Sequence, residues 1–275
     1  MPKIEVHTIN GFKVKKPQIL SQQGDGREVK GKELFEEPYA NIYICARKKS
    51  GKSVVIENII KKTIDKNTIV IMFASTLYKD PVLKAIKHYC EQKDIPFYGY
   101  TEIKSKGVDR LQTIINTMQE GDEDEDNSDE DDEPEYLDLC NIDIEKETRK
   151  SKYITPKYLF IFDDISNELK SKSLVALLKK NRHTKSRIIL SSQWLNDLLP
   201  ESRKQIDYLL LFGGFSIEKL EVIHKDADLS IDLETFIKIY RYATKDRFHF
   251  LYIDCVKQEF RKDFNKQFLI PEKFE

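Results

Sequence analysis

The sequence lacks any apolar stretch long enough to cross a bilayer. Its long apolar runs, such as 158–162 and 208–212, are far shorter than the roughly 20 residues that a membrane helix needs. The first residues contain no basic segment followed by an apolar stretch, which is the pattern of a secretory signal. We therefore expect neither a membrane span nor secretion.

Cysteine, histidine and glycine are also scarce. The four cysteines, Cys45, Cys90, Cys140 and Cys255, are widely separated, and the five histidines stand singly. Without a CxxC pair or a histidine at ligand spacing, the sequence predicts a reducing compartment, no disulfide framework and no zinc site. The chain has only 10 glycines, so a glycine at a motif position is not a product of composition.

The charges are balanced in number but not in position. The 275 residues include 46 Lys plus Arg and 47 Asp plus Glu, for a net charge of −1. Of the acidic residues, 13 lie between Glu120 and Asp138, with no basic residue among them. The rest of the chain is therefore basic, which suits a polyanionic partner such as nucleic acid. A generic lysine-rich surface explains this charge equally well.

The acidic segment, 120–138, has too little apolar surface to offset the entropy of ordering. We predict a disordered insert. A simple solvated loop is the favoured interpretation of this insert. The alternative is that the insert competes with DNA for a basic surface of the protein.

Strands and helices alternate along the chain. Predicted strands cover 41–46, 68–74, 96–100, 158–162, 187–191, 208–212 and 248–253, and predicted helices cover 51–62, 80–92, 108–118, 169–180, 217–225 and 233–242. The strands are apolar throughout rather than on one face, which indicates a mainly parallel sheet covered by helices on both sides. We expect an N-terminal arm or hairpin over 1–37, a domain over 38–255 and a C-terminal tail over 256–275.

The first strand leads into a phosphate-loop motif. Backbone N–H groups at the start of a helix cradle phosphates, and a glycine allows close approach. The lysine of the motif contacts the β and γ phosphates of ATP, and the hydroxyl after it coordinates Mg²⁺. The matching residues, with alanine where glycine is usual first, are Ala46, Arg47, Lys48, Lys49, Ser50, Gly51, Lys52 and Ser53.

The strand at 158–162 ends in Asp163 and Asp164, which fits the Walker B pattern. Alone, two carboxylates there usually mark only a strand end or a helix cap. After a phosphate loop with strands between, we expect Asp163 to hold Mg²⁺ and Asp164 to act as general base on the attacking water. No NKxD follows, so guanine recognition has no support.

Two further polar residues are candidates. Gln193 follows the strand at 187–191 and either senses the γ-phosphate or is a polar loop residue. Arg182 follows the helix at 169–180. It is either a basic residue that interacts with the helix dipole or an arginine finger that acts on a neighbouring subunit.

Three segments in this order resemble the FtsK–HerA superfamily, and within it the poxvirus-type genome-packaging ATPases of large DNA viruses, virophages and polintons. The segments are ARKKSGKS at 46–53, YLFIFDDIS at 158–166 and the block at 181–212. That block has Arg182 eleven positions before Gln193, followed by Leu199, Pro200 and Arg203. The departures are Ala46, an Asp at position 164 where many members have Glu, and the acidic insert.

The resemblance implies an α/β RecA-like (ASCE) domain with an extra strand between the phosphate-loop and Walker B strands. It also implies a homo-oligomeric ring that hydrolyses ATP and drives double-stranded DNA into preformed capsids, in contact with capsid proteins, in the host cytoplasm or the virion. A RecA-like helicase or recombination motor and a non-motor ATP-binding assembly protein are the alternatives.

Overall fold

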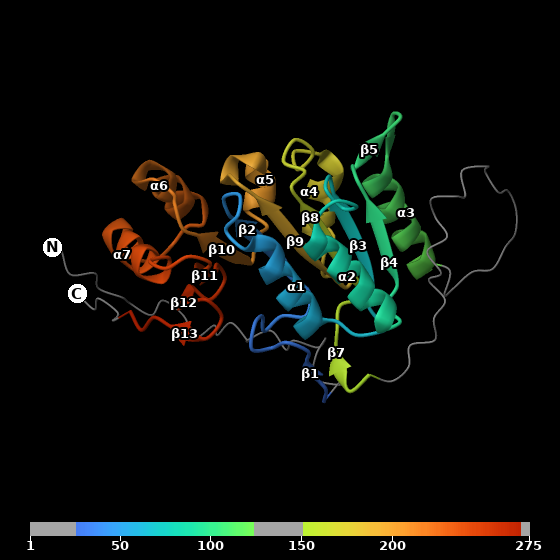
Figure 1. Cartoon of the computed structure of the whole chain (residues 1–275), viewed down its shortest axis with the longest axis horizontal. Coiled ribbons are helices and arrows are strands. Elements are labelled where there is room, and N and C mark those ends of the chain that lie inside the picture. Colours follow the sequence, from blue (N-terminus) through green and yellow to red (C-terminus); the bar gives the residue numbers. More distant parts are fainter. Residues whose placement is uncertain (1–25, 124–150, 271–275) are drawn as a thin grey trace, which may run out of the picture.

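The computed structural model describes residues 26–123 and 151–270 of the chain (Figure 1). Most of the acidic segment and the first 25 residues of the expected arm therefore lie outside the described residues. Within the described ranges, no helix is both long and apolar enough to cross a membrane.

A nine-stranded sheet forms the centre of the molecule, in the order β13-β12-β11-β10-β2-β9-β8-β3-β4. The six strands from β10 to β4 are parallel, and β11, β12 and β13 continue the sheet in antiparallel pairing. The strands are β2 (Asn41–Cys45), β3 (Ile69–Ala74), β4 (Phe97–Tyr100), β8 (Tyr158–Asp163), β9 (Ser186–Ser192), β10 (Tyr208–Phe212), β11 (Phe250–Asp254), β12 (Glu259–Lys262) and β13 (Lys266–Gln267). The predicted parallel sheet and its extra strand, β9 between β2 and β8, are confirmed.

Helices cover both faces of this sheet (Figure 1). On one face lie α1 (Lys52–Thr63) and α2 (Pro81–Gln92). On the other lie α3 (Arg110–Glu123), α4 (Lys172–Lys180), α6 (Ile217–Asp226) and α7 (Leu233–Ala243). Successive strand residues point to opposite faces, so Ile42 and Ile44 join the first core while Tyr43 and Cys45 join the second. This two-sided burial explains why the strands are apolar throughout.

Short elements complete the fold. They are two small sheets, formed by β1 (Glu28–Val29) with β7 (Tyr153–Ile154) and by β5 (Lys104–Ser105) with β6 (Val108–Asp109), together with the short helices η2 (Leu195–Asp197) and α5 (Pro200–Arg203).

Several element boundaries differ from the sequence-based expectation. Helix α3 continues to Glu123, four residues into the segment expected to be a loop. Strands β12 and β13 lie in the expected C-terminal tail, where antiparallel pairing with β11 adds them to the sheet. The last predicted strand begins at Phe250 instead of position 248, because Phe248 has a φ of 69° and cannot continue an extended strand.

Candidate active site

The phosphate loop connects the end of β2 to the start of α1. Gly51 has a φ of 95° and caps the helix, a conformation that glycine adopts without a steric penalty. Lys52 is the first helical residue, so the backbone N–H groups of this turn point out of the helix N-terminus. Ala46 is fully buried, and its N–H donates to the carbonyl of Ser192 at 2.9 Å. That bond fixes the beginning of the loop to β9.

The phosphate loop and the Walker B strand meet at an ion pair. Lys52 Nζ donates to Asp163 Oδ1 at 2.6 Å and to Ser191 Oγ at 3.2 Å, and Ser191 Oγ donates to Asp163 Oδ1 at 2.6 Å. Asp163 is only 2% exposed, so its negative charge depends on these partners for compensation. Two predicted site residues that are 111 positions apart in sequence are thereby brought together.

Asp164 lies beside the same ammonium group. Its Oδ1 is 3.4 Å from Lys52 Nζ, its side chain is 32% exposed, and its φ of 56° turns the chain sharply at the strand end. With Lys48 and Gln193, Asp164 lines a cavity of about 350 Å³ at the carboxyl edge of the sheet. Two of the predicted catalytic side chains, Asp164 and Gln193, therefore line the same cavity.

Among the described residues, no group of three or more His, Cys, Asp or Glu side chains could hold a metal alone. A Mg²⁺ site in this kind of loop needs fewer protein ligands, because one or two protein oxygens bind the ion together with the phosphates. Ser53, in the first turn of α1, and the carboxylate of Asp163 supply hard oxygen ligands of the correct type. The donor set therefore fits Mg²⁺.

Tyr43 is a functional candidate that the sequence did not reveal. It lies in the middle of β2, fully buried. Its hydroxyl donates to the carbonyl of Trp194 at 2.6 Å and lies 2.5 Å from Ser192 Oγ. These two contacts bracket Gln193 on both sides and hold its turn against the phosphate-loop strand. The only signal in sequence was a tyrosine in an otherwise mainly aliphatic run.

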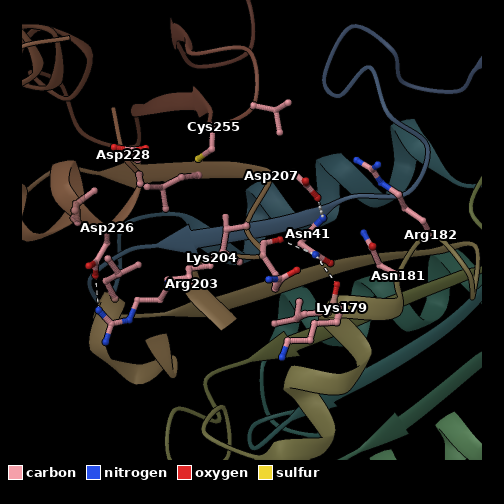
Figure 2. A pocket seen from close by; sticks show the side chains of 18 of the residues that line it. Asn41, Lys179, Asn181, Arg182, Arg203, Lys204, Asp207, Asp226, Asp228 and Cys255 are labelled. Atoms are coloured by element: carbon pink, nitrogen blue, oxygen red, sulfur yellow. Dashed lines mark hydrogen bonds and ion pairs between the residues drawn. The ribbon is translucent and has the colours of Figure 1, made fainter. Parts of the chain in front are cut away.

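Arg182 lies at the N-terminal ends of the parallel strands, whereas the phosphate loop lies at their C-terminal ends. It follows α4 and precedes β9, whereas Gln193 follows β9, and seven residues of strand span roughly 20 Å. Arg182 lines a second cavity, of about 520 Å³, together with Asn41 and Asp207 (Figure 2). The structure therefore does not bring Arg182 to the phosphate loop of its own chain.

Two other residues of the block at 181–212, Arg203 and Asp207, line the same cavity. Arg203, at the end of α5, pairs with Asp226 at the end of α6 (Figure 2). The carboxylate of Asp207 accepts a hydrogen bond from the Asn41 N–H at 2.7 Å. Burial nevertheless raises the pKa of Asp207 above 3.8, because desolvation disfavours the charged form. Arg203 thus links two helices rather than contacting the phosphate loop.

The fold and this site define a P-loop NTPase with an additional strand between the phosphate-loop and Walker B strands. Residues 132–262 match the family model of the poxvirus A32 protein, and this confirms the resemblance to poxvirus-type packaging ATPases. The matched range is slightly less than half of the chain. It contains Asp163, Asp164, Arg182 and Gln193, and the phosphate loop precedes it.

Solved structures share the fold. The genome-packaging NTPase B204 of Sulfolobus turreted icosahedral virus 2 in complex with AMP is 19% identical, with a TM-score of 0.54 over 82% of this chain and 98% of B204. The AMPPCP complex is 21% identical, with a TM-score of 0.54 over 86% and 100% of the two chains. B204 of Sulfolobus turreted icosahedral virus, a DNA-packaging ATPase, is 18% identical, with a TM-score of 0.51 over 82% and 97%. No curated protein sequence matches this chain.

Proposed function

We propose that this chain is an ATP-hydrolysing motor that moves double-stranded DNA into preformed viral capsids. The observation that carries the ATPase part is the ion pair between Lys52 and Asp163, with Asp164 and Gln193 beside it at one sheet edge. The packaging part is supported by the family match over 132–262 and by the fold shared with B204, which is itself a packaging NTPase.

Each site residue has a role in this proposal. The backbone of 46–53 and the ammonium of Lys52 bind the phosphates of ATP. Ser53 and Asp163 hold Mg²⁺, which when bound neutralises charge on the β and γ phosphates. Asp164 accepts a proton from the attacking water. Gln193 contacts that water or the γ-phosphate and so responds to hydrolysis.

The proposal includes a homo-oligomeric ring. Arg182 and the phosphate loop lie at opposite edges of one sheet, so Arg182 can act on a γ-phosphate only in a neighbouring subunit. That arrangement requires a head-to-tail contact between different surfaces of two copies, and such contacts form rings when the rotation closes. The ring would dock on capsid proteins, in the host cytoplasm or within the virion.

The direct test measures the ATPase rate with and without double-stranded DNA, alongside the particle mass in each condition. We expect turnover that rises on addition of DNA and a mass several times that of one chain. The Lys52→Ala variant is the control for contaminating ATPases. A monomer whose turnover ignores DNA would overturn the motor proposal.

Two outcomes would instead favour the alternatives. Unwinding of a forked duplex, together with stimulation by single strands, would indicate a helicase or recombination motor. Tight ATP binding with no DNA-stimulated turnover would indicate a non-motor assembly protein.

A further inference from the structure

Phe248 is an exposed aromatic residue in an unusual backbone conformation. It lies between α7 and β11, is 60% exposed and has a φ of 69°. Nine non-glycine residues of the described ranges have a positive φ, and the other eight are Lys, Asp or Gln. A bulky side chain in this region is rare and costs free energy, and such strain often accompanies function.

The surrounding structure holds Phe248 in place. His249, the next residue, bonds through Nδ1 to Asp263 Oδ2 at 2.7 Å, and the Phe250 N–H donates to Asp263 Oδ1 at 3.2 Å. On the other side, the Thr244 N–H donates to the carbonyl of Tyr240 at 3.0 Å. Because both ends of the loop are fixed, the ring is presented to solvent in a defined position.

That position is against the phosphate loop. A Cβ atom built on Gly51 would lie 3.2 Å from Phe248 Cδ1, so the ring packs directly on the glycine that precedes Lys52. Val54, in the first turn of α1, is a second exposed apolar side chain near the loop, at 49% exposed. The guanidinium carbon of Arg247 lies 5.1 Å from the centroid of the ring, within the range of a cation–π contact.

We propose that Phe248 stacks on the nucleobase of the nucleotide whose phosphates bind at Gly51 and Lys52. This rests on the proposed ATPase function and adds the contact for the base. The phosphate loop binds only the charged part of the nucleotide, and an exposed aromatic ring next to it supplies an apolar flat surface. Stacking on aromatic rings is favourable for every base. Purines, with the larger ring system, should gain most.

The test compares two ligands and two substitutions. The ligands are ATP and inorganic tripolyphosphate, both with Mg²⁺, because tripolyphosphate has no base. Phe248→Gly removes the ring at a position where glycine favours the observed φ, so the variant should fold. Phe248→Tyr keeps the ring. We expect Phe248→Gly to bind ATP about tenfold or more weakly, with tripolyphosphate affinity unchanged, and Phe248→Tyr to behave as the wild type.

A matched control is Tyr242→Ala. Tyr242 is an exposed aromatic residue of α7, 65% exposed, whose ring packs against Phe268; its loss should leave ATP affinity unchanged. The wild type should also prefer purine over pyrimidine triphosphates, and Phe248→Gly should lose that preference.

The outcomes are separable. Unchanged ATP affinity in Phe248→Gly, or an equal loss for ATP and tripolyphosphate, would overturn base stacking while leaving the phosphate site intact. A wild type that binds neither ligand would overturn the proposed function, and base stacking with it.

Discussion

Lys52 Nζ lies 2.6 Å from Asp163 Oδ1, which joins the phosphate loop to the tip of the Walker B strand. The pair is largely buried, with side-chain exposures of 11% and 3%. In the proposed function each partner has a second role, because the ammonium would bind phosphate and the carboxylate would bind Mg²⁺. The same contact therefore serves the stability of the fold and the chemistry proposed for the site.

Lys52→Ala should abolish ATP binding and also destabilise the chain. The substitution leaves Asp163 buried without a cation, which typically costs about 3 kcal/mol. Urea unfolding and calorimetric titration with ATP measure the two effects. The control is Lys61→Ala on the same helix, whose partner Glu57 forms an exposed pair; it should change stability by less than about 1 kcal/mol. Equal unfolding midpoints for the two variants would contradict a structural role for the buried pair.

Asp164→Asn should bind ATP and fail to hydrolyse it. The amide keeps the shape of the side chain but cannot accept a proton from water, and general-base catalysis typically contributes 10² to 10⁴-fold in rate, so we expect a loss on the order of 100-fold or more. Single-turnover ATPase assays measure this at saturating ATP. Wild-type turnover in this variant would remove Asp164 from the role of base.

Arg182 should act between subunits. Mixtures of Arg182→Ala with Lys52→Ala chains should show ATPase activity that departs from the sum of the two variants measured separately, because some interfaces regain one intact Lys52 with one intact Arg182. Mixtures of Lys61→Ala with Lys52→Ala provide the reference for simple dilution. Strictly additive rates would argue against a shared interface site.

Tyr43→Phe should lower kcat several-fold while leaving the KM for ATP nearly unchanged. The hydroxyl holds the turn that contains Gln193 and does not itself lie in the phosphate loop. Each buried hydrogen bond lost with the hydroxyl also costs about 1 kcal/mol of stability. Tyr252→Phe, at a buried tyrosine of β11, is the matched control. If Tyr43→Phe and Gln193→Ala lower kcat independently, the two residues do not act together.

The free energy of unfolding of Asp207→Asn, relative to that of the wild type, should increase as the pH rises. Burial raises the pKa of Asp207 above 3.8 in the folded chain, so the folded state binds the proton more tightly than the unfolded state. The wild type then loses stability as the pH rises through the folded pKa, and asparagine has no such dependence. Unfolding free energies at pH 7 and near pH 4 test this. A difference between variant and wild type that is independent of pH would contradict it.

Most of the fold followed from local patterns. The alternation of strands and helices, the two-sided burial of the strands and the turn at Gly51 are visible in short windows, because side-chain periodicity and backbone conformation are local properties. Asp163 and Asp164 were recognisable for the same reason, as carboxylates at the end of an apolar run.

The contacts between these parts were decided by the order and register of the strands. Asp163 lies opposite Ser191, and Cys45 lies opposite Ser192, so β9 brings a serine to the ion pair and its following turn to the hydroxyl of Tyr43. No short window contains this information, because each contact joins segments distant in the chain.

By itself, the sequence predicted which residues would bind phosphate and which would provide carboxylates, because that chemistry depends on residue type and local backbone shape. Only the tertiary structure decided that Lys52 meets Asp163, that Arg182 lies at the far edge of the sheet, and that Phe248 rests on Gly51. These relationships depend on how distant segments pack, and packing is a property of the whole folded chain.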